Sequence, residues 1–253
     1  MYPSEHSKST DMTGMVAIVT GGAGGIGEET CRVLAQNGAS IAIIDYNPAD
    51  TMLAELREMG TKCMALRLDV RSKTEVVGAV ESILHEFGQI DCIAGLAGVC
   101  PRTRFLNVTE EEWDETFDIN MKGVFFLTQA VFPHMMERKT GSIVLASSIA
   151  GRAYGLIGGP HYAASKAALQ AFARYLARVG GEYGIRVNCV LPGPTETSMI
   201  ADLPNGPLDP KMFLLGRTGQ PIDTAQAILY LASPASNWVT GVWLDVNGGL
   251  LMA

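Results

Sequence analysis

Residues 15–27 read MVAIVTGGAGGIG, and this stretch decides which fold the rest of the chain can adopt. Its apolar run is continuous rather than alternating, which is typical of a strand buried on both faces of a parallel sheet. A glycine-rich turn follows directly and leads into a helix-like segment, 26–37. Gly21, Gly25 and Gly27 permit a tight turn, close approach of a pyrophosphate and close helix packing. Because the helix N-terminus adds free amide donors, the stretch predicts a dinucleotide-binding turn.

Asp45 indicates which dinucleotide is bound. It ends the second predicted strand, 18 residues beyond Gly27. A carboxylate at this place accepts hydrogen bonds from the ribose hydroxyls of NAD. It would repel the 2′-phosphate of NADP, and Gly24 stands where a basic partner for that phosphate is expected. The sequence therefore favours NAD as the cofactor.

The remaining pattern extends this turn into a whole fold. Seven apolar runs predict strands at 15–20, 40–45, 62–70, 90–98, 141–148, 184–191 and 241–246. Helix-like segments lie between them at 26–37, 49–59, 72–87, 110–137, 160–182 and 221–233. Such alternation predicts an α/β protein, a single doubly wound Rossmann-type domain with a seven-stranded parallel sheet and helices on both faces.

The domain is expected to span residues 13–253, after a polar and flexible tail at 1–12. The irregular segment 194–216 is rich in proline and glycine, and a connection of this length is more often a functional lid than an idle loop. We therefore expect a substrate lid there.

Composition excludes several functional classes. The formal net charge of −7 and the absence of a basic run argue against nucleic acid as a partner. Five cysteines without metal-ligand spacing predict reduced thiols in the cytoplasm and no metal site. No apolar run approaches 18 residues, so neither membrane insertion nor export is expected.

The segment 159–172, GPHYAASKAALQAF, holds a candidate reacting pair. Tyr162 and Lys166 are four residues apart on a predicted helix, so their side chains share one face. An ammonium beside a phenol favours the phenolate, which predicts a tyrosine pKa below its usual value of about 10. The alternative is an ordinary pair on the helix surface. His161, beside Tyr162, is interpreted as a solvated or packing residue.

Seven motifs, in order, resemble those of the classical short-chain dehydrogenase/reductase family, and the resemblance covers nearly the whole chain, from about Met15 to Ala253. They are TGGAGGIG (20–27), LDV (68–70), NMKG (120–123), SSIAG (147–151), YAASK (162–166), PGPTET (192–197) and DVNGG (245–249).

The resemblance implies a set of site residues. The implied catalytic residues are Asn120, Ser148, Tyr162 and Lys166. The implied and inferred cofactor-binding residues are Gly21, Gly25, Ile26, Gly27, Asp45, Asp69, Val70, Ala97, Gly98, Tyr162, Lys166, Pro192, Gly193, Thr195 and Thr197. In this scheme Tyr162 is the acid/base, Lys166 also holds the nicotinamide ribose, Ser148 binds the substrate oxygen, and Asn120 holds a water that links Lys166 to solvent.

Two departures from the family pattern concern the site. The fourth predicted strand ends in GLAG (95–98), without the two asparagines that the family usually has there. Ser148 precedes Tyr162 by 14 residues, one more than in many relatives. Ser148 is aligned with the catalytic serine because Gly151 follows it by three residues, and Ser147 is the alternative.

The expected function is oxidation of an apolar secondary alcohol, cyclic, steroid-like or aryl, or reduction of its ketone, in an assembly expected to be a homotetramer. The alternatives are an NADP-dependent 3-oxoacyl-carrier-protein-type ketoreductase and an inactive dinucleotide-sensing protein. The candidate pocket residues are Val99, Cys100, Ile149, Tyr154, Leu156, Ile157, Pro194, Met199 and Leu203. Arg102, Arg104 and Arg152 lie near this rim in sequence and either meet an anionic substrate tail or, as the more ordinary reading, lie on the surface.

Overall fold

The computed structural model describes residues 10–153, 157–201, 203 and 208–252. Its centre is one seven-stranded sheet with every strand parallel, in the order β3-β2-β1-β4-β5-β6-β7. The strands are β1 (Val16–Thr20), β2 (Ser40–Asp45), β3 (Cys63–Arg67), β4 (Cys92–Gly95), β5 (Gly141–Ala146), β6 (Ile185–Pro192) and β7 (Trp243–Val246). All seven predicted strands are confirmed, although β3 and β4 are shorter than their apolar runs.

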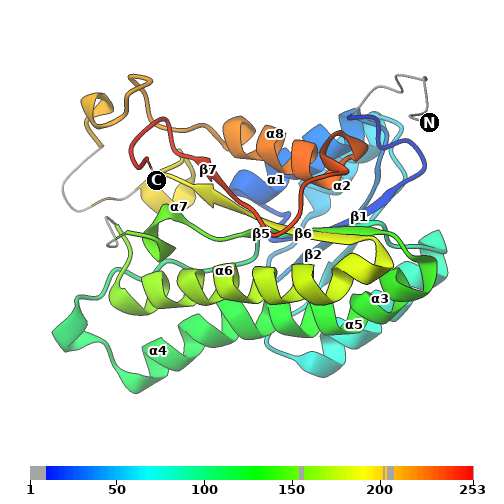
Figure 1. Ribbon diagram of the computed structural model, residues 1–253, viewed down its shortest axis with the longest axis horizontal. Coiled ribbons are helices and arrows are strands. Elements are labelled where there is room, and N and C mark those ends of the chain that lie inside the picture. Colours follow the sequence, from blue (N-terminus) through cyan, green and yellow to red (C-terminus); the bar gives the residue numbers. More distant parts are fainter. Residues whose placement is uncertain (1–9, 154–156, 202, 204–207, 253) are drawn as a thin grey trace.

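Helices cover both faces of this sheet (Figure 1). One face carries α1 (Gly25–Gln36), α2 (Asp50–Glu58) and α8 (Pro221–Ala232). The other carries α3 (Lys73–Phe87), α4 (Glu110–Phe117), α5 (Gly123–Arg138) and α6 (Pro160–Gly180). Successive side chains of β1 alternate between the two apolar clusters, with Val16 and Ile18 on one face and Ala17 and Val19 on the other. The doubly wound fold is therefore confirmed.

The predicted helix at 110–137 is divided in the structure. A π-helical turn, Asp118–Lys122, separates α4 from α5 and contains Asn120. Such one-turn bulges insert a residue into the helical repeat and are frequent at functional sites. The continuous apolar pattern did not reveal this turn.

The ends of the predicted domain also differ in detail. Met12, assigned to the tail, is fully buried and its N–H donates to Asn37 O (2.7 Å). Residues 1–9 lie outside the described part of the chain. The predicted lid segment contains a short helix, α7 (Ser198–Ala201), and a 3₁₀ turn at Pro210–Met212. Residues 202 and 204–207 are not described, so its action as a lid stays a prediction.

Candidate active site

The glycine-rich turn forms a cradle that side chains would fill. A Cβ at Gly21 would lie 3.0 Å from the backbone nitrogen of Ala97, and one at Gly27 would overlap the carbonyl oxygen of Gly21. Gly25 has a φ of +55°, which favours glycine, and its Cβ would lie 3.2 Å from the Cγ2 of Thr197. A cavity of about 750 Å³ lies against these glycines. The cradle therefore fits a dinucleotide pyrophosphate.

Asp45 lies at one end of this cavity, where β2 ends. Its carboxylate accepts the N–H groups of Ala23 (3.0 Å) and Asn47 (2.8 Å), so it also fixes the glycine-rich turn. A carboxylate oxygen has more than one lone pair, and these two bonds leave acceptor capacity for ribose hydroxyls.

Asp69 and Val70 line the same cavity beyond the end of β3. The carboxylate of Asp69 is held by the guanidinium of Arg71, with Nη2 2.6 Å from Oδ2. This hydrogen bond lowers the pKa of Asp69. Arg71, which sequence reasoning missed, also lines the cavity and pairs with Glu115 of α4 (3.4 Å). Its position next to an expected cofactor residue was the only signal available.

The GLAG segment keeps its hydrogen bonds without the missing asparagines. The hydroxyl of Thr20, at the end of β1, accepts the N–H groups of both Leu96 (3.0 Å) and Ala97 (3.1 Å). A Cβ at Gly98 would lie 3.0 Å from Asn120 Oδ1 and 3.3 Å from the ammonium of Lys166. A bare backbone at Gly98 thus leaves room for the buried side chains of Asn120 and Lys166.

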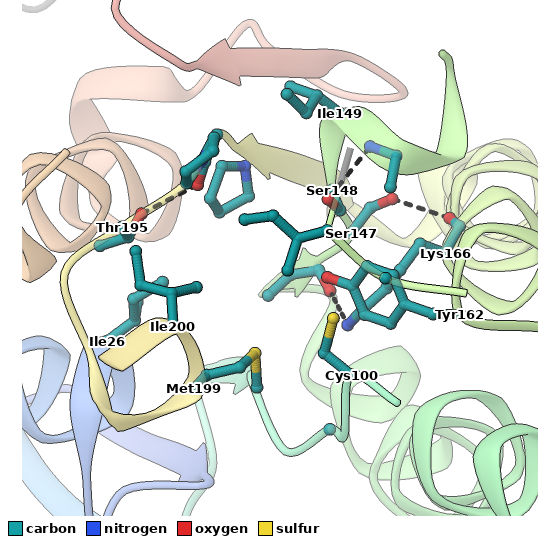
Figure 2. Close-up of a pocket in the computed structure, with 18 of the residues that line it drawn as sticks. Ile26, Cys100, Ser147, Ser148, Ile149, Tyr162, Lys166, Thr195, Met199 and Ile200 are labelled. Atoms are coloured by element: carbon teal, nitrogen blue, oxygen red, sulfur yellow. Dashed lines mark hydrogen bonds between the residues drawn. The ribbon is translucent and has the colours of Figure 1, made fainter. Parts of the chain in front are cut away.

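A second cavity, of about 130 Å³, adjoins the first and shares Ile26, Gly98, Val99, Thr197 and Met199 with it. Ser148, Tyr162 and Lys166 lie together on one of its walls, across from Ile26 and Ile200 (Figure 2). Ser148 follows β5 and begins a 3₁₀ turn, with its Oγ accepting the N–H of Ala150 (3.1 Å). Tyr162 and Lys166 are in the first two turns of α6. They are therefore not an ordinary surface pair.

Burial controls the electrostatics of Tyr162. Desolvation raises its pKa well above the usual value, the nearby Cys100 thiol adds to the rise, and a hydrogen bond to Ser148 only partly offsets it. The predicted lowering of this pKa by Lys166 is wrong in the structure. The reason is desolvation, and the ammonium of Lys166, 5.8 Å from the centre of the ring, donates instead to the carbonyl of Ala146 (2.8 Å).

Lys166 itself is almost completely buried. Desolvation lowers its pKa from 10.5 to about 8, and negative charge on Cys100 or Cys189 would oppose this change. A lysine with such a pKa gives up its proton far more readily than a surface lysine.

Asn120 is fully buried and links two segments of the site. Its side chain accepts the N–H of Val99 (2.8 Å) and donates to Val99 O (3.0 Å) and Ser165 Oγ (3.0 Å). The π-helical turn directs it inward, where it fixes the chain after β4 against α6. The water-holding role implied by the resemblance stays a prediction.

The geometry favours Ser148 over Ser147 as the reacting serine. The hydroxyl of Ser147 donates to the backbone carbonyl of Lys166 (2.7 Å) and accepts from the side chain of Gln170 (2.9 Å). Ser147 thus ties the end of β5 to α6, which is a structural task.

The segment after β6 closes the other side of the cleft. Pro192 pairs with Val246 of β7, and a Cβ at Gly193 would lie 2.9 Å from the Cβ of Asn247. The Thr195 hydroxyl donates to Gly193 O (3.0 Å), and that of Thr197 donates to Thr195 O (3.3 Å). All four predicted residues of this segment, Pro192, Gly193, Thr195 and Thr197, line the smaller cavity.

Most of the predicted substrate pocket surrounds the same cavity, with Val99, Cys100, Ile149, Ile157, Pro194 and Met199 on its walls. Leu203 is not among its lining residues, and Tyr154 and Leu156 lie outside the described part of the chain. The arginines do not line it either: Arg152 pairs with Asp245 (2.6 Å), Arg104 is exposed, and Arg102 donates to Met199 O (2.6 Å).

His161 is fully buried rather than solvated. Neither ring nitrogen has a hydrogen-bond partner among the described residues, and Nε2 lies 3.6 Å from the Glu112 carboxylate. It does not line the cavity. The reading of His161 as a packing residue holds.

Similar proteins agree with this architecture. A family model described as enoyl-(acyl carrier protein) reductase matches residues 21–251. The 3-oxoacyl-[acyl-carrier-protein] reductase of Thermotoga maritima is 36% identical over 95% of this chain and 99% of its own. Cyclopentanol dehydrogenase of Comamonas testosteroni is 37% identical, with coverages of 92% and 96%.

A solved structure is similar over nearly the whole chain. Carveol dehydrogenase from Mycobacterium avium in complex with NAD has a TM-score of 0.90, 30% identity and coverages of 95% and 99%. The length of the match, the identity and the shared sheet leave one assignment: the chain belongs to the classical short-chain dehydrogenase/reductase family of oxidoreductases.

Proposed function

We propose that the protein is an NAD-dependent oxidoreductase that interconverts an apolar secondary alcohol, cyclic, steroid-like or aryl, and its ketone. One observation carries the proposal: Ser148, Tyr162 and Lys166 meet in a mostly apolar cavity that opens into the glycine-lined one. Val99, Ile149 and Met199 form apolar walls that suit a hydrocarbon substituent. Such walls offer a charged substrate few charged or hydrogen-bonding partners.

The residues of the chain divide the proposed work between them. Tyr162 transfers a proton to or from the substrate oxygen, and Ser148, on the same wall of the cavity, binds the same oxygen. The buried Lys166 places a positive charge beside this pair and can hold the nicotinamide ribose. Asn120 keeps Val99 and α6 in register, which holds the wall of the pocket.

The cofactor residues fit the same scheme. When bound, NAD supplies the nicotinamide C4 that accepts or returns the hydride. Gly21, Gly25 and Gly27 would cradle its pyrophosphate, and Asp45 would accept from its adenosine ribose. Thr195 and Thr197 would hold the nicotinamide amide.

A second candidate, an NADP-dependent ketoreductase acting on 3-oxoacyl thioesters, is favoured by the similarity to the Thermotoga maritima reductase. Asp45, together with Gly24 in place of a basic residue, weighs against it. The similarity to cyclopentanol dehydrogenase and to the NAD complex of carveol dehydrogenase supports the first candidate.

Initial rates with NAD and NADP on cyclopentanol, carveol, a hydroxysteroid, an aryl carbinol and a 3-oxoacyl thioester would decide between them. We expect kcat/KM at least about 100-fold higher with NAD, because a carboxylate repels a 2′-phosphate. Asp45→Ala should narrow this ratio, whereas Asp50→Ala, which removes an exposed carboxylate of α2, should not. Equal kcat/KM with both cofactors would refute NAD preference, and turnover of the thioester alone with NADPH would favour the second candidate.

We further propose a cytoplasmic homotetramer. The five cysteines are unpaired, as a reducing compartment requires. Among the described residues, no helix has the length and apolar character needed to cross a bilayer. The faces of α5 and α6 expose aromatic side chains that support assembly between copies.

A further inference from the structure

Two glycines stand between the 3₁₀ turn of Ser148 and the start of α6. Gly159 has a φ of −69°, which any residue adopts, so its backbone conformation does not require glycine. Gly158 lines the smaller cavity beside Tyr162 and Cys100. The proposed chemistry gives neither glycine a role, so the space around them must explain their presence.

Gly158 is pressed against the reacting tyrosine. A Cβ built at Gly158 would overlap Cδ1 of the Tyr162 ring and lie 2.9 Å from its Cγ. It would also lie 3.0 Å from the Sγ of Cys100. Cγ and Cδ1 are at the base of a rigid ring, so they cannot yield without moving the hydroxyl at the other end.

Gly159 fixes the backbone that makes this contact. Its N–H donates to Pro101 O (2.7 Å), and a Cβ there would lie 2.5 Å from Thr103 O. The pair therefore packs against the loop after β4 on one side and against Tyr162 on the other. Since Asn120 holds Val99 in the same loop, the surface facing Tyr162 is anchored at both ends.

We propose that Gly158 is a positioning residue, whose bare backbone seats the Tyr162 ring and thereby sets the phenol hydroxyl next to Ser148. The inference rests on the proposed function, because Gly158 is inferred to position the group that transfers the proton, the hydroxyl of Tyr162. A methyl group at 158 displaces the ring, and misplacement by about 1 Å can reduce turnover about 100-fold.

Gly158→Ala tests this positioning role, with Gly181→Ala as its matched control. Gly181 lies at the far end of α6 with a φ of −58°, and a Cβ there meets nothing within 4 Å. We expect Gly158→Ala to lower kcat at least tenfold and to raise the primary deuterium isotope effect on kcat. The Kd for NAD, measured by calorimetry, should stay within about twofold of the wild-type value, and Gly181→Ala should match the wild type throughout.

A double variant separates positioning from a general structural defect. In a Tyr162→Phe background the hydroxyl is already absent, so Gly158→Ala should cost no further turnover. An equal loss of kcat in both backgrounds would overturn the inference, as would an unfolded circular dichroism spectrum or lost NAD binding in Gly158→Ala. Wild-type turnover by Gly158→Ala would also overturn it, whereas a wild-type protein inactive on every substrate would instead refute the proposed function.

Discussion

The ammonium of Lys166 donates to Ala146 O, and the partly buried ring of Tyr162 has its centre 5.8 Å from this ammonium. At the scale of single residues, desolvation outweighs the attraction that their spacing on α6 suggests. Burial raises the pKa of Tyr162 and lowers that of Lys166 to about 8, so it shifts both groups toward their neutral forms, although Lys166 still carries most of its charge at pH 7.

Tyr162→Phe removes the proposed proton carrier and keeps the packing of the ring against Gly158. We expect kcat to fall about 10²- to 10⁴-fold, which is the usual contribution of acid/base catalysis, with an unchanged Kd for NAD. The measurement needs a substrate whose hydride step limits turnover. A variant that keeps more than about a tenth of wild-type kcat would show that another group transfers the proton.

Lys166→Met should change how stability depends on pH. Because the pKa of Lys166 is lowered from 10.5 to about 8 on folding, the unfolded chain binds more protons between these values. The contribution of Lys166 to stability then rises with pH across that window, and below pH 8 the cost of burying its charge is fully present. Lys166→Met lacks this dependence, so its free energy of unfolding relative to wild type should fall by up to about 3 kcal/mol from pH 7.5 to 10.

Urea unfolding at a series of pH values measures this difference. Lys73→Met, which removes an exposed ammonium on α3, serves as the control and should track the wild type. Parallel stability curves for the wild type and Lys166→Met would show that Lys166 keeps an ordinary pKa in the folded protein.

At the scale of elements, the site depends on links between the ends of neighbouring strands. Thr20 closes β1 and holds the chain after β4 through two N–H groups, and Ser147 joins the end of β5 to α6. Parallel strands bring these ends to one edge of the sheet, so short side chains can bridge segments far apart in sequence.

Thr20→Val keeps the shape of the side chain but removes the hydroxyl oxygen that accepts hydrogen bonds from the N–H groups of Leu96 and Ala97. A buried N–H left without a partner costs on the order of 1–3 kcal/mol. We expect the free energy of unfolding to fall by about 2 kcal/mol and NAD to bind more weakly. Thr51→Val, an exposed position on α2, is the control, and equal stability of Thr20→Val and the wild type would show that water satisfies these groups.

At the scale of the whole molecule, α5 and α6 lie side by side on one outer face of the fold (Figure 1). Phe125 of α5 and Phe172 of α6 have ring centres 6.1 Å apart, and Phe125 and Tyr175 are exposed. Aromatic groups on a neighbouring pair of helices suit a symmetric contact between copies.

Light scattering at micromolar concentration should therefore give four times the chain mass of 27.0 kDa. Phe125→Glu places a charge in the proposed contact and should shift the mass to that of a smaller species. Trp238→Glu, at a fully exposed position outside these two helices, should leave the mass unchanged. A monomer mass for the wild type would refute the tetramer.

Local patterns determined much of this protein. Seven apolar runs and the turn from Thr20 to Gly27 predicted the parallel sheet and its dinucleotide cradle, because strand burial and glycine geometry depend on neighbours in sequence. The motifs also predicted which residues the fold brings together, and Ser148, Tyr162 and Lys166 do line one cavity. Their chemical roles stay predictions.

Only the tertiary structure decided the properties that depend on distant contacts. The Thr20 hydroxyl accepts a hydrogen bond from the backbone of a residue 76 positions away. Both Ser147 and Ser148 line the smaller cavity, but the hydroxyl of Ser147 is already hydrogen-bonded to two residues of α6. The ring of Tyr162 packs against Gly158, and the neighbouring Gly159 is hydrogen-bonded to the loop that follows β4. The pKa of Tyr162 is raised rather than lowered as predicted, and that of Lys166 is lowered, because burial, which no spacing encodes, sets the cost of charge.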